Sequence, residues 1–290
     1  MTDTAPFIPA KPGSKLAGFN LLAEIGRGAA SIIYLAQDPK TKQVWGLKHV
    51  QKHTDKDQRF LDQAMNEYEV GSRVRNAAVR HVPKLIKARA GLLQVKELFL
   101  VMEYVDGVAL DKNLPGTFEV AMEVFLQTAR GLEAIHNAGF VHADMKPANV
   151  VVDETHRVKI IDLGQACPIG TVKERIQGTP DYIAPEQVHR RAITELTDVY
   201  NFGATMYWVL TQKTIPTALG TSDSLMDSLD DSLIERAAPV RSVNKRCPES
   251  LSNLIQHCIE PKLQKRPAGK MPEVIERLGE VAREFGVDVR

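Results

Sequence analysis

Short apolar runs separated by turn residues characterise the first third of the chain. Runs of this kind, bounded by glycine, proline or aspartate, are typical of antiparallel strands. The strands predicted in this way lie at residues 20–25, 32–36, 44–50, 82–88 and 98–104. One amphipathic helix is predicted among them at residues 58–75, where apolar positions recur at helical spacing. This part of the chain is therefore expected to form a small sheet with one main helix.

Helical periodicity dominates the rest of the chain, most clearly over residues 118–138. The change from strand-like to helix-like patterning falls near Val105 and indicates a boundary between two lobes. The expected fold class is α+β. The expected parts are a flexible N-terminal tail, a sheet-rich N-lobe and a larger helical C-lobe, at residues 1–15, 16–104 and 105–290.

Composition excludes some functions without indicating one. Of the 290 residues, 43% are hydrophobic and 25% charged, as in ordinary globular proteins. A net charge of +1 gives no reason to expect a nucleic-acid partner, and no apolar run is long enough to span a bilayer. The three cysteines lack metal-ligand spacing, so a reducing, cytoplasmic setting is expected rather than a disulfide framework. The oligomeric state stays open.

The segment HADMKPAN at residues 142–149, followed by a DLG turn, concentrates the groups that phosphoryl transfer needs. Asp144 can accept the proton of an attacking hydroxyl, and Lys146 can neutralise charge on the moving phosphoryl group. Asn149 and Asp162, the acid of the DLG turn, offer oxygen ligands for a divalent cation such as Mg²⁺ or Mn²⁺. The set predicts a phosphotransferase site.

These motifs resemble the catalytic loop and metal-binding turn of Hanks-type protein kinases, with a strand pair predicted around them at residues 150–152 and 158–161. The Lys-Pro after the catalytic acid is similar to the serine/threonine branch, and the order of elements resembles the bilobal kinase fold over residues 16–285. The resemblance implies transfer of the ATP γ-phosphate, with Mg²⁺ or Mn²⁺, to serine or threonine hydroxyls of a protein substrate. It also suggests a bacterial source.

Two alternatives stay open at this point. One is a nucleotide-binding pseudokinase that acts as a scaffold. The other is a small-molecule phosphotransferase of kinase-like fold, although such enzymes usually lack the Lys-Pro and the GTP…APE segment found here. Turnover of nucleotide would exclude the first alternative, and transfer to a protein hydroxyl would exclude the second.

The resemblance implies a nucleotide-binding side. Gly26 and Gly28, between the first two predicted strands, would let the backbone cover the phosphates, while Ser31 takes the place of a third glycine. The adenine ring would be enclosed by the sheet, the interlobe hinge and the predicted hairpin. The residues implied are Ile33, Gly46, Met102, Glu103, Val105 and Val151.

Lys48 resembles the strand lysine that binds the α- and β-phosphates of ATP and pairs with a helix glutamate. Glu67 is preferred to Glu69 as its partner, because Glu67 shares a face with the apolar residues of the predicted helix. Gly71 departs from the family, which usually places a bulky residue one turn after the glutamate.

Residues 178–186, GTPDYIAPE, resemble the end of a kinase activation segment. By this resemblance, Glu186 would form a buried ion pair with Arg266, and Asp198 would bond to the backbone of the catalytic loop. Thr179 would contact the catalytic acid and lysine and favour serine/threonine specificity.

Ala143 stands where regulated kinases usually carry an arginine before the catalytic Asp144, so the chain resembles the non-RD type. That arginine commonly anchors a phosphorylated loop through charge-assisted hydrogen bonds. Residues 163–186 contain no serine, and only Thr171 and Thr179 as threonines. Activity without phosphorylation of this loop is therefore expected.

The histidines show no metal-ligand pattern. His142 is expected to be a buried structural residue that bonds backbone near the metal turn. His49, His53 and His81 lack ligand spacing and are expected at the surface. None of them is assigned a catalytic role.

Overall fold

The computed structural model describes residues 9–90, 94–217, 219, 231 and 234–287. The chain divides into two compact units. The first contains the segment up to Arg75 and Arg80–Asp106, and the second contains Asn76–Val79 and the chain from Gly107 onward. More than half of the predicted tail, residues 1–8, lies outside the described residues, and Lys15 already belongs to the first strand.

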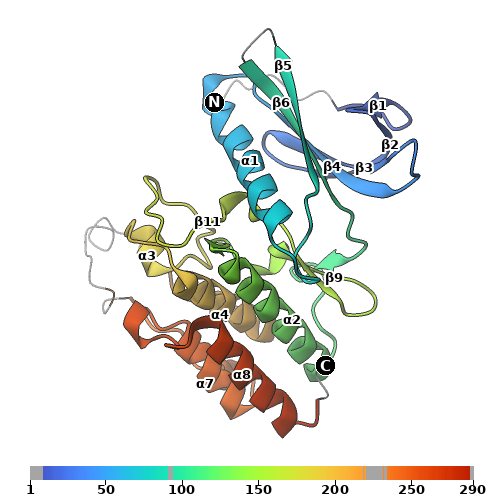
Figure 1. Ribbon diagram of the computed structural model, residues 1–290. Helices are drawn as coiled ribbons and strands as arrows, with labels where there is room; N and C mark the ends of the chain where they lie inside the picture. Colours follow the sequence, from blue (N-terminus) through green and yellow to red (C-terminus); the bar gives the residue numbers. More distant parts are fainter. Residues whose placement is uncertain (1–8, 91–93, 218, 220–230, 232–233, 288–290) are drawn as a thin grey trace. The chain divides into compact units, whose positions relative to one another are not determined.

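The first unit is built on a six-stranded antiparallel sheet in the order β1-β2-β3-β4-β6-β5 (Figure 1). Its strands are β1 Lys15–Leu16, β2 Phe19–Arg27, β3 Ser31–Gln37, β4 Val44–Gln51, β5 Lys84–Ala90 and β6 Gln94–Glu103. The Gly28 N–H donates to the Ser31 carbonyl at 2.8 Å, which closes the turn between β2 and β3.

Side chains of this sheet alternate between two apolar clusters, as period-two patterning requires. In β6, Phe99 and Val101 join one cluster, whereas Leu98 and Leu100 join the other. Helix α1, Gln58–Arg73, packs on the second cluster. Its buried residues recur at helical spacing and are Leu61, Ala64, Glu67, Val70 and Gly71.

Strand β5 begins two residues later than the sequence pattern predicts. The Val82 N–H donates to the Gly71 carbonyl at 3.1 Å, and Pro83 has no N–H for a neighbouring strand. Residues 80–82 therefore run beside helix α1 before β5 begins, and His81 also bonds to Glu103 at the end of β6. We call this segment the α1 strap.

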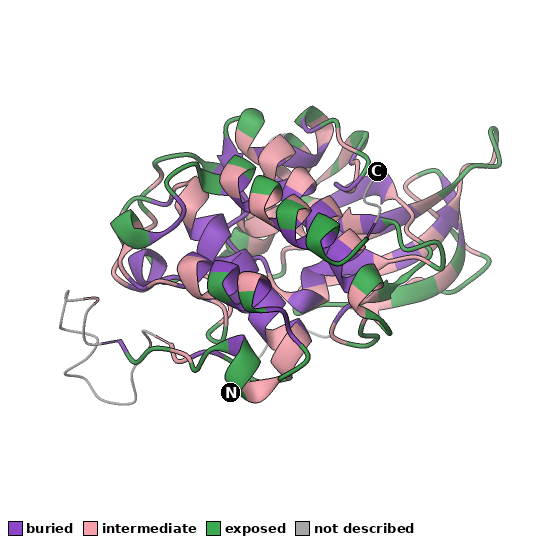
Figure 2. Ribbon diagram, turned by 90° about the horizontal axis from the view of Figure 1, so that it is seen from below, coloured by how far each residue is buried: buried purple, intermediate pink, exposed green. Residues whose placement is uncertain are grey.

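The second unit is mainly helical (Figure 1). Helix α2, Phe118–Asn137, packs against α4, Glu195–Thr211, and against α8, Lys270–Glu284. Helix α7, Glu249–Cys258, packs on α4 and α8, and the short helices α3, Pro185–Val188, and α6, Val240–Val243, complete the described set. Figure 2 shows helices with one buried and one exposed face, as amphipathic periodicity predicts.

Short strands in the second unit position the candidate site. Strand β9, Val150–Val152, pairs with β10, Val158–Ile160, and with β7, Val108–Ala109. The predicted hairpin is thus present. Strand β8, Phe140–Val141, pairs with β11, Cys167–Pro168. These pairings fix both ends of the catalytic loop and the start of the segment that follows the DLG turn.

The three cysteines, Cys167, Cys247 and Cys258, are buried and free. Within the described residues, no helix combines the length and the apolar character needed to cross a bilayer. The same part of the chain contains no group of three histidine, cysteine or acidic side chains that could hold a metal.

Candidate active site

The catalytic loop places an acid, a lysine and a hydroxyl in mutual contact. Lys146 Nζ lies 2.8 Å from Asp144 Oδ2 and 2.7 Å from Thr179 Oγ1. The Thr179 hydroxyl donates to Asp144 Oδ1 at 2.8 Å. Both carboxylate oxygens are therefore oriented, and a positive charge lies beside them. Asp144 is only 8% exposed, so this arrangement is shielded from most of the solvent.

Asp198, on helix α4, orients the loop backbone. Its Oδ1 accepts from the Ala143 N–H and its Oδ2 from the His142 N–H, both at 2.8 Å. These bonds accompany a left-handed Ala143 backbone, with φ of 60°, which is uncommon outside glycine. His136 Nε2 is also 2.8 Å from Asp198 Oδ2. Burial alone would raise the pKa of Asp198, but the His136 hydrogen bond and the other contacts outweigh burial and lower that pKa.

The oxygen ligands predicted for a metal lie at the end of the loop and in the DLG turn. The Asn149 amide donates to the Asp144 carbonyl at 2.8 Å, which leaves its side-chain oxygen for another partner. The Ile161 N–H donates to the Asn149 carbonyl at 2.9 Å, so the turn is tied to the loop directly before Asp162. Asp162 has a left-handed backbone with φ of 61°, a conformation often found at functional sites. A carboxylate and an amide oxygen fit a hard divalent cation.

His142 is fully buried, as the sequence indicates, and bonds backbone on both sides. Its Nδ1 accepts the Asp144 N–H at 3.3 Å, and its Nε2 lies 3.4 Å from the Ile161 carbonyl. The ring therefore links the catalytic loop to the strand that leads into the metal turn.

An apolar cluster occupies the surroundings of Ala143. Its members are Val141, Ala143, Cys167 and Ile193. The activation segment is attached to the same region by backbone bonds, because Gly170 donates to the Ile193 carbonyl and Ile193 to the Thr171 carbonyl, each at 2.8 Å. Gln187 Nε2 donates to the Ala143 carbonyl at 2.8 Å. These contacts with Ala143 and Ile193 are all neutral, and the Lys173 ammonium adds a hydrogen bond to the Gln165 carbonyl at 2.7 Å.

Glu186 and Arg266 form the buried, bidentate ion pair expected from the resemblance. Arg266 Nη1 and Nη2 donate to the two Glu186 oxygens at 2.7 and 2.9 Å, and the Thr197 hydroxyl donates to Oε1 at 2.8 Å. Burial opposes ionisation of Glu186, but Arg266 outweighs it and lowers the pKa of this carboxyl. The Arg266 guanidinium also stacks over Tyr200, 4.7 Å from the ring centroid.

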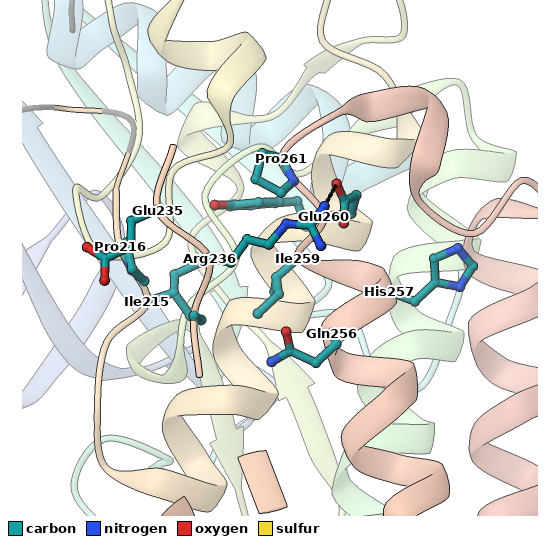
Figure 3. A pocket seen from close by; sticks show the side chains of 11 residues that line it. Ile215, Pro216, Glu235, Arg236, Gln256, His257, Ile259, Glu260 and Pro261 are labelled. Carbon is teal, nitrogen blue, oxygen red and sulfur yellow. Dashed lines mark hydrogen bonds and ion pairs between the residues drawn. The ribbon is translucent and has the colours of Figure 1, made fainter. Parts of the chain in front are cut away.

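A cavity of about 190 Å³ lies in the second unit beside this scaffold (Figure 3). Tyr200, Glu260 and Pro261 line it, and an ion pair of 2.9 Å joins Arg236 to Glu260 there. The carbonyls of Glu260 and Pro261 accept hydrogen bonds from Arg266. No residue of the predicted site lines the cavity, so it borders the scaffold rather than the catalytic loop.

The first unit contains the predicted lysine–glutamate pair. Lys48 Nζ, on β4, lies 2.5 Å from Glu67 Oε2, on α1. Glu69 instead pairs with Arg73 at the exposed side of the helix. Gly71 lies where a Cβ would overlap Cγ2 of Val82, so Val82 fills the space that a bulky side chain at Gly71 would take.

The other predicted nucleotide-side residues are distributed over both units. In the first unit, Gly26 lies in β2, Ile33 in β3, Gly46 in β4, Met102 and Glu103 at the end of β6, and Gly28 and Val105 in the adjoining turns. Gly46 is the register partner of Met102. Val151 belongs to β9 of the second unit and is 8% exposed.

One histidine expectation was wrong. His49 is buried at 5% exposure rather than at the surface. It stacks on Phe99 with ring centroids 4.3 Å apart, and its Nε2 lies 2.8 Å from Glu97. Phe99 is the register partner of His49 on the neighbouring strand β6, and stacking on it covers the imidazole ring.

Three residues of the site region were missed by sequence reasoning. Arg80 binds Glu67, His136 binds Asp198, and Gln187 binds Ala143. His136 follows the buried positions Ala129 and Leu132 of α2 at helical spacing, which is a usable signal. For Arg80 and Gln187 the local pattern offers none.

The acid–lysine–threonine set around the buried Asp144, the neighbouring oxygen ligands and the lysine–glutamate pair between β4 and α1 define a protein-kinase type of phosphotransferase. The chain belongs to the protein kinase domain family, whose pattern matches residues 19–277. This match confirms the expected α+β, bilobal kinase fold. Kinases of this family use ATP and a divalent metal, and act on protein substrates.

Similar proteins include kinases from bacteria and yeast. The chain is 26% identical over 276 residues to a probable serine/threonine-protein kinase of Clostridium acetobutylicum, covering 92% of this chain and 40% of that protein. It is 31% identical over 199 residues to the serine/threonine-protein kinase PknB of Mycobacterium tuberculosis, covering 64% and 31%. It is 28% identical over 199 residues to cAMP-dependent protein kinase type 3 of Saccharomyces cerevisiae, covering 67% and 48%.

These relatives confirm the Hanks-type, serine/threonine class of the domain. The chain spans less than half the length of each of these three relatives. The comparison therefore concerns their kinase domains.

Proposed function

We propose that this chain transfers the γ-phosphate of ATP to serine or threonine hydroxyls of a protein, with Asp144 as the general base. The arrangement that carries the proposal is the contact of Asp144 with both Lys146 and Thr179. The carboxylate would accept the hydroxyl proton as the oxygen attacks phosphorus. Lys146 would stabilise negative charge on the transferred group.

Asn149 and Asp162 are the proposed ligands of a magnesium ion. Their oxygens match its preference for hard ligands, and the Asn149 amide is already turned by its bond to the Asp144 carbonyl. When bound, the ion would neutralise phosphate charge and align the reacting groups. On the sheet unit, Lys48 would bind phosphate oxygens while Glu67 holds it, and Gly26 and Gly28 would offer backbone N–H groups.

Activity without phosphorylation of the activation segment is part of the proposal. In the place of an arginine–phosphate contact, Ala143 packs with Cys167 and Ile193, and backbone bonds join Thr171 to Ile193. Gln187 adds a bond to the Ala143 carbonyl. None of these contacts needs an added negative charge, so they support an active arrangement that forms without modification.

The cytoplasm is the proposed compartment. The three thiols are free and buried, as suits a reducing environment. The net charge of +1 supports no nucleic-acid partner. A protein with an accessible serine or threonine is the proposed substrate.

The test is phosphate transfer followed by intact-mass spectrometry. The purified chain is incubated with Mg-ATP and a generic basic acceptor protein, beside Asp144→Asn as a matched variant. We expect phosphate on serine or threonine of the acceptor, and a rate about 100- to 10,000-fold lower for Asp144→Asn. Equal transfer by both proteins would contradict the role of Asp144. Nucleotide binding without transfer to any acceptor would favour the scaffold alternative.

A further inference from the structure

Glu67 binds two cations, of which the kinase resemblance implies only Lys48. Lys48 Nζ lies 2.5 Å from Glu67 Oε2, and Arg80 Nη2 lies 2.8 Å from Glu67 Oε1. The Glu67 side chain is 1% exposed and the Arg80 side chain 12%. Each carboxylate oxygen thus has its own cation, in surroundings where solvent screens charge poorly.

Arg80 belongs to the α1 strap, which is also bonded to helix α1 at Gly71, one turn after Glu67. The Gly71 carbonyl accepts the Val82 N–H at 3.1 Å and lies 3.0 Å from His81 Nδ1. A Cβ at Gly71 would overlap Val82. The missing side chain of Gly71 therefore lets the strap approach α1 closely enough for Arg80 to reach Glu67, one helical turn earlier.

The other edge of the strap is bonded to strand β6. The Glu103 N–H donates to the His81 carbonyl at 2.8 Å, and Glu103 Oε2 accepts the His81 N–H at 3.2 Å. Arg80 is thus carried by a segment held on both sides within the first unit. Its guanidinium approaches Glu67 from a fixed backbone rather than from a free loop.

The second cation changes what happens when Lys48 engages phosphate. A buried carboxylate that loses its partner is strongly destabilised. With Oε1 held by Arg80, Glu67 keeps a compensating charge while Lys48 Nζ is shared with a nucleotide.

We propose that Arg80 is a positioning residue for nucleotide binding, which fixes the Glu67 carboxylate so that Lys48 is presented to the phosphate oxygens of ATP. The proposal rests on the proposed function of Lys48 and Glu67. It also explains Gly71, because the lack of a side chain there lets the strap pack directly against helix α1. Helix α1 has in this way an anchor that depends on neither phosphorylation nor a partner protein.

The test compares binding of Mg-ATP and of adenosine by calorimetry, for the wild type and Arg80→Met. Lys48 acts on the phosphates alone, so misplacing it should weaken ATP without affecting adenosine. We expect the Kd of ATP to rise about 10- to 100-fold, the effect expected of a positioning defect. The Kd of adenosine should stay within about twofold. A purely structural defect would weaken both ligands together.

Three further variants sharpen the comparison. Arg80→Lys retains a cation and should recover part of the ATP affinity. In a Glu67→Gln background, Arg80→Met should add less than about twofold, because the two residues act as one unit. Arg59→Met is the matched control, because Arg59 is an exposed arginine of helix α1, which also carries Glu67, and it stacks over Phe60 at 4.6 Å. This variant should bind both ligands as the wild type does.

The outcomes separate two failures. Wild-type ATP affinity in Arg80→Met, with a loss in Glu67→Gln and Lys48→Met, would overturn the role of Arg80 alone. Wild-type ATP affinity in all three would overturn the proposed role of the lysine–glutamate pair. Equal weakening of ATP and adenosine would make Arg80 merely structural. If Arg80→Met does not fold, Arg80→Lys and Arg80→Gln are compared, and equal ATP affinities of these two would reject the proposal.

Discussion

At the scale of single residues, the Thr179 hydroxyl organises the two charged groups of the catalytic loop. It accepts from Lys146 and donates to Asp144 at the same time. A hydroxyl can do both, whereas a methyl of the same size can do neither. The orientation of Asp144, the proposed base, therefore depends on a neutral side chain of the activation segment.

Replacing Thr179 by valine should lower kcat by about 10- to 100-fold, because the proposed base loses its orientation while the fold keeps its volume. Initial rates of acceptor phosphorylation with saturating ATP measure the effect. Nucleotide affinity should change little, since the contacts of the Thr179 hydroxyl are with Asp144 and Lys146 of the catalytic loop.

Thr171→Val is the matched control for this substitution. The Thr171 hydroxyl donates to the Pro168 carbonyl at 2.6 Å, within the same short stretch of chain, and the segment is attached through the Thr171 backbone. We expect Thr171→Val to keep its activity within about twofold, as is usual for substitutions away from a buried network. A loss comparable with that of Thr179→Val would instead contradict activity without phosphorylation of this segment.

At the scale of elements, the close packing of helix α1 against the α1 strap requires a glycine at residue 71 opposite the valine at residue 82. Alanine favours helix over glycine by about 1 kcal/mol, but a Cβ at Gly71 would overlap Val82. Overpacking costs typically about 1–3 kcal/mol, so it should outweigh the helix propensity. We expect Gly71→Ala to lower the free energy of unfolding, measured by urea denaturation.

The size of this effect should depend on Val82. In a Val82→Ala background the contact with Cγ2 is removed and only the Cβ of residue 82 remains, 3.0 Å from the new Cβ, so Gly71→Ala should destabilise the protein less than it does in the wild type. Val82→Ala alone should cost stability because it removes buried methyl groups. Destabilisation of equal size in both backgrounds would mean that the helix and the strap do not meet as described.

The elements themselves are largely readable in the sequence, because local periodicity determines them. The helices around residues 58–75 and 118–138 and the hairpin after the catalytic loop agree with the structure to within one or two residues at most ends. Strand β5 was misplaced at its start, since a long-range bond to Gly71 competes with the sheet for Val82. A pattern of neighbouring residues contains no information about that competition.

Prediction of the candidate site likewise succeeded where local sequence determines the residues and failed where long-range contacts do. The residues with motif spacing were found in the sequence, whereas the contacts of Arg80 and Gln187 were not. Arg80 and Glu67 lie 13 residues apart, across the end of a helix, and their contact depends on how closely the strap approaches. The burial of His49 was missed because a polar residue can occupy an inward position when it finds a stacking and a hydrogen-bonding partner.

At the scale of the whole molecule, two buried carboxylates join distant parts of the second unit. Glu186 binds Arg266, 80 residues away, and Asp198 binds His142, 56 residues away. The pKa of each carboxyl is below its ordinary value of 4.5 and 3.8, respectively. A depressed folded-state pKa means that the native protein binds protons less readily than the unfolded chain does.

Stability should therefore fall in acid. The contribution of both groups is complete above about pH 4.5, and it is lost as the pH falls through the folded-state values. Urea midpoints between pH 7 and pH 3 measure the loss. Glu186→Gln should be less stable at neutral pH by about 3–5 kcal/mol, the usual effect of leaving a buried partner uncompensated, and its stability should depend less on pH.

Glu249→Gln is the control for this measurement. Glu249 is 74% exposed and pairs with Arg241 at 3.3 Å, an exposed contact that contributes about 0–1 kcal/mol. Its pH profile should follow that of the wild type. Parallel profiles for Glu186→Gln and the wild type would show that the acid sensitivity originates elsewhere.

Because all three cysteines are free and buried, the rate at which each thiol is alkylated can measure local opening of the protein. Burial raises the pKa of Cys247 to about 11 and that of Cys258 to about 12, and it also raises that of Cys167. Alkylation needs an accessible thiolate, so a modifying reagent reports how often each site opens. Alkylation of Cys167, in β11, reports opening of the activation segment, and alkylation of Cys258 reports opening of helix α7. Two alkylation rates from one unlabelled protein would thus separate opening of the catalytic segment from melting of the helical core.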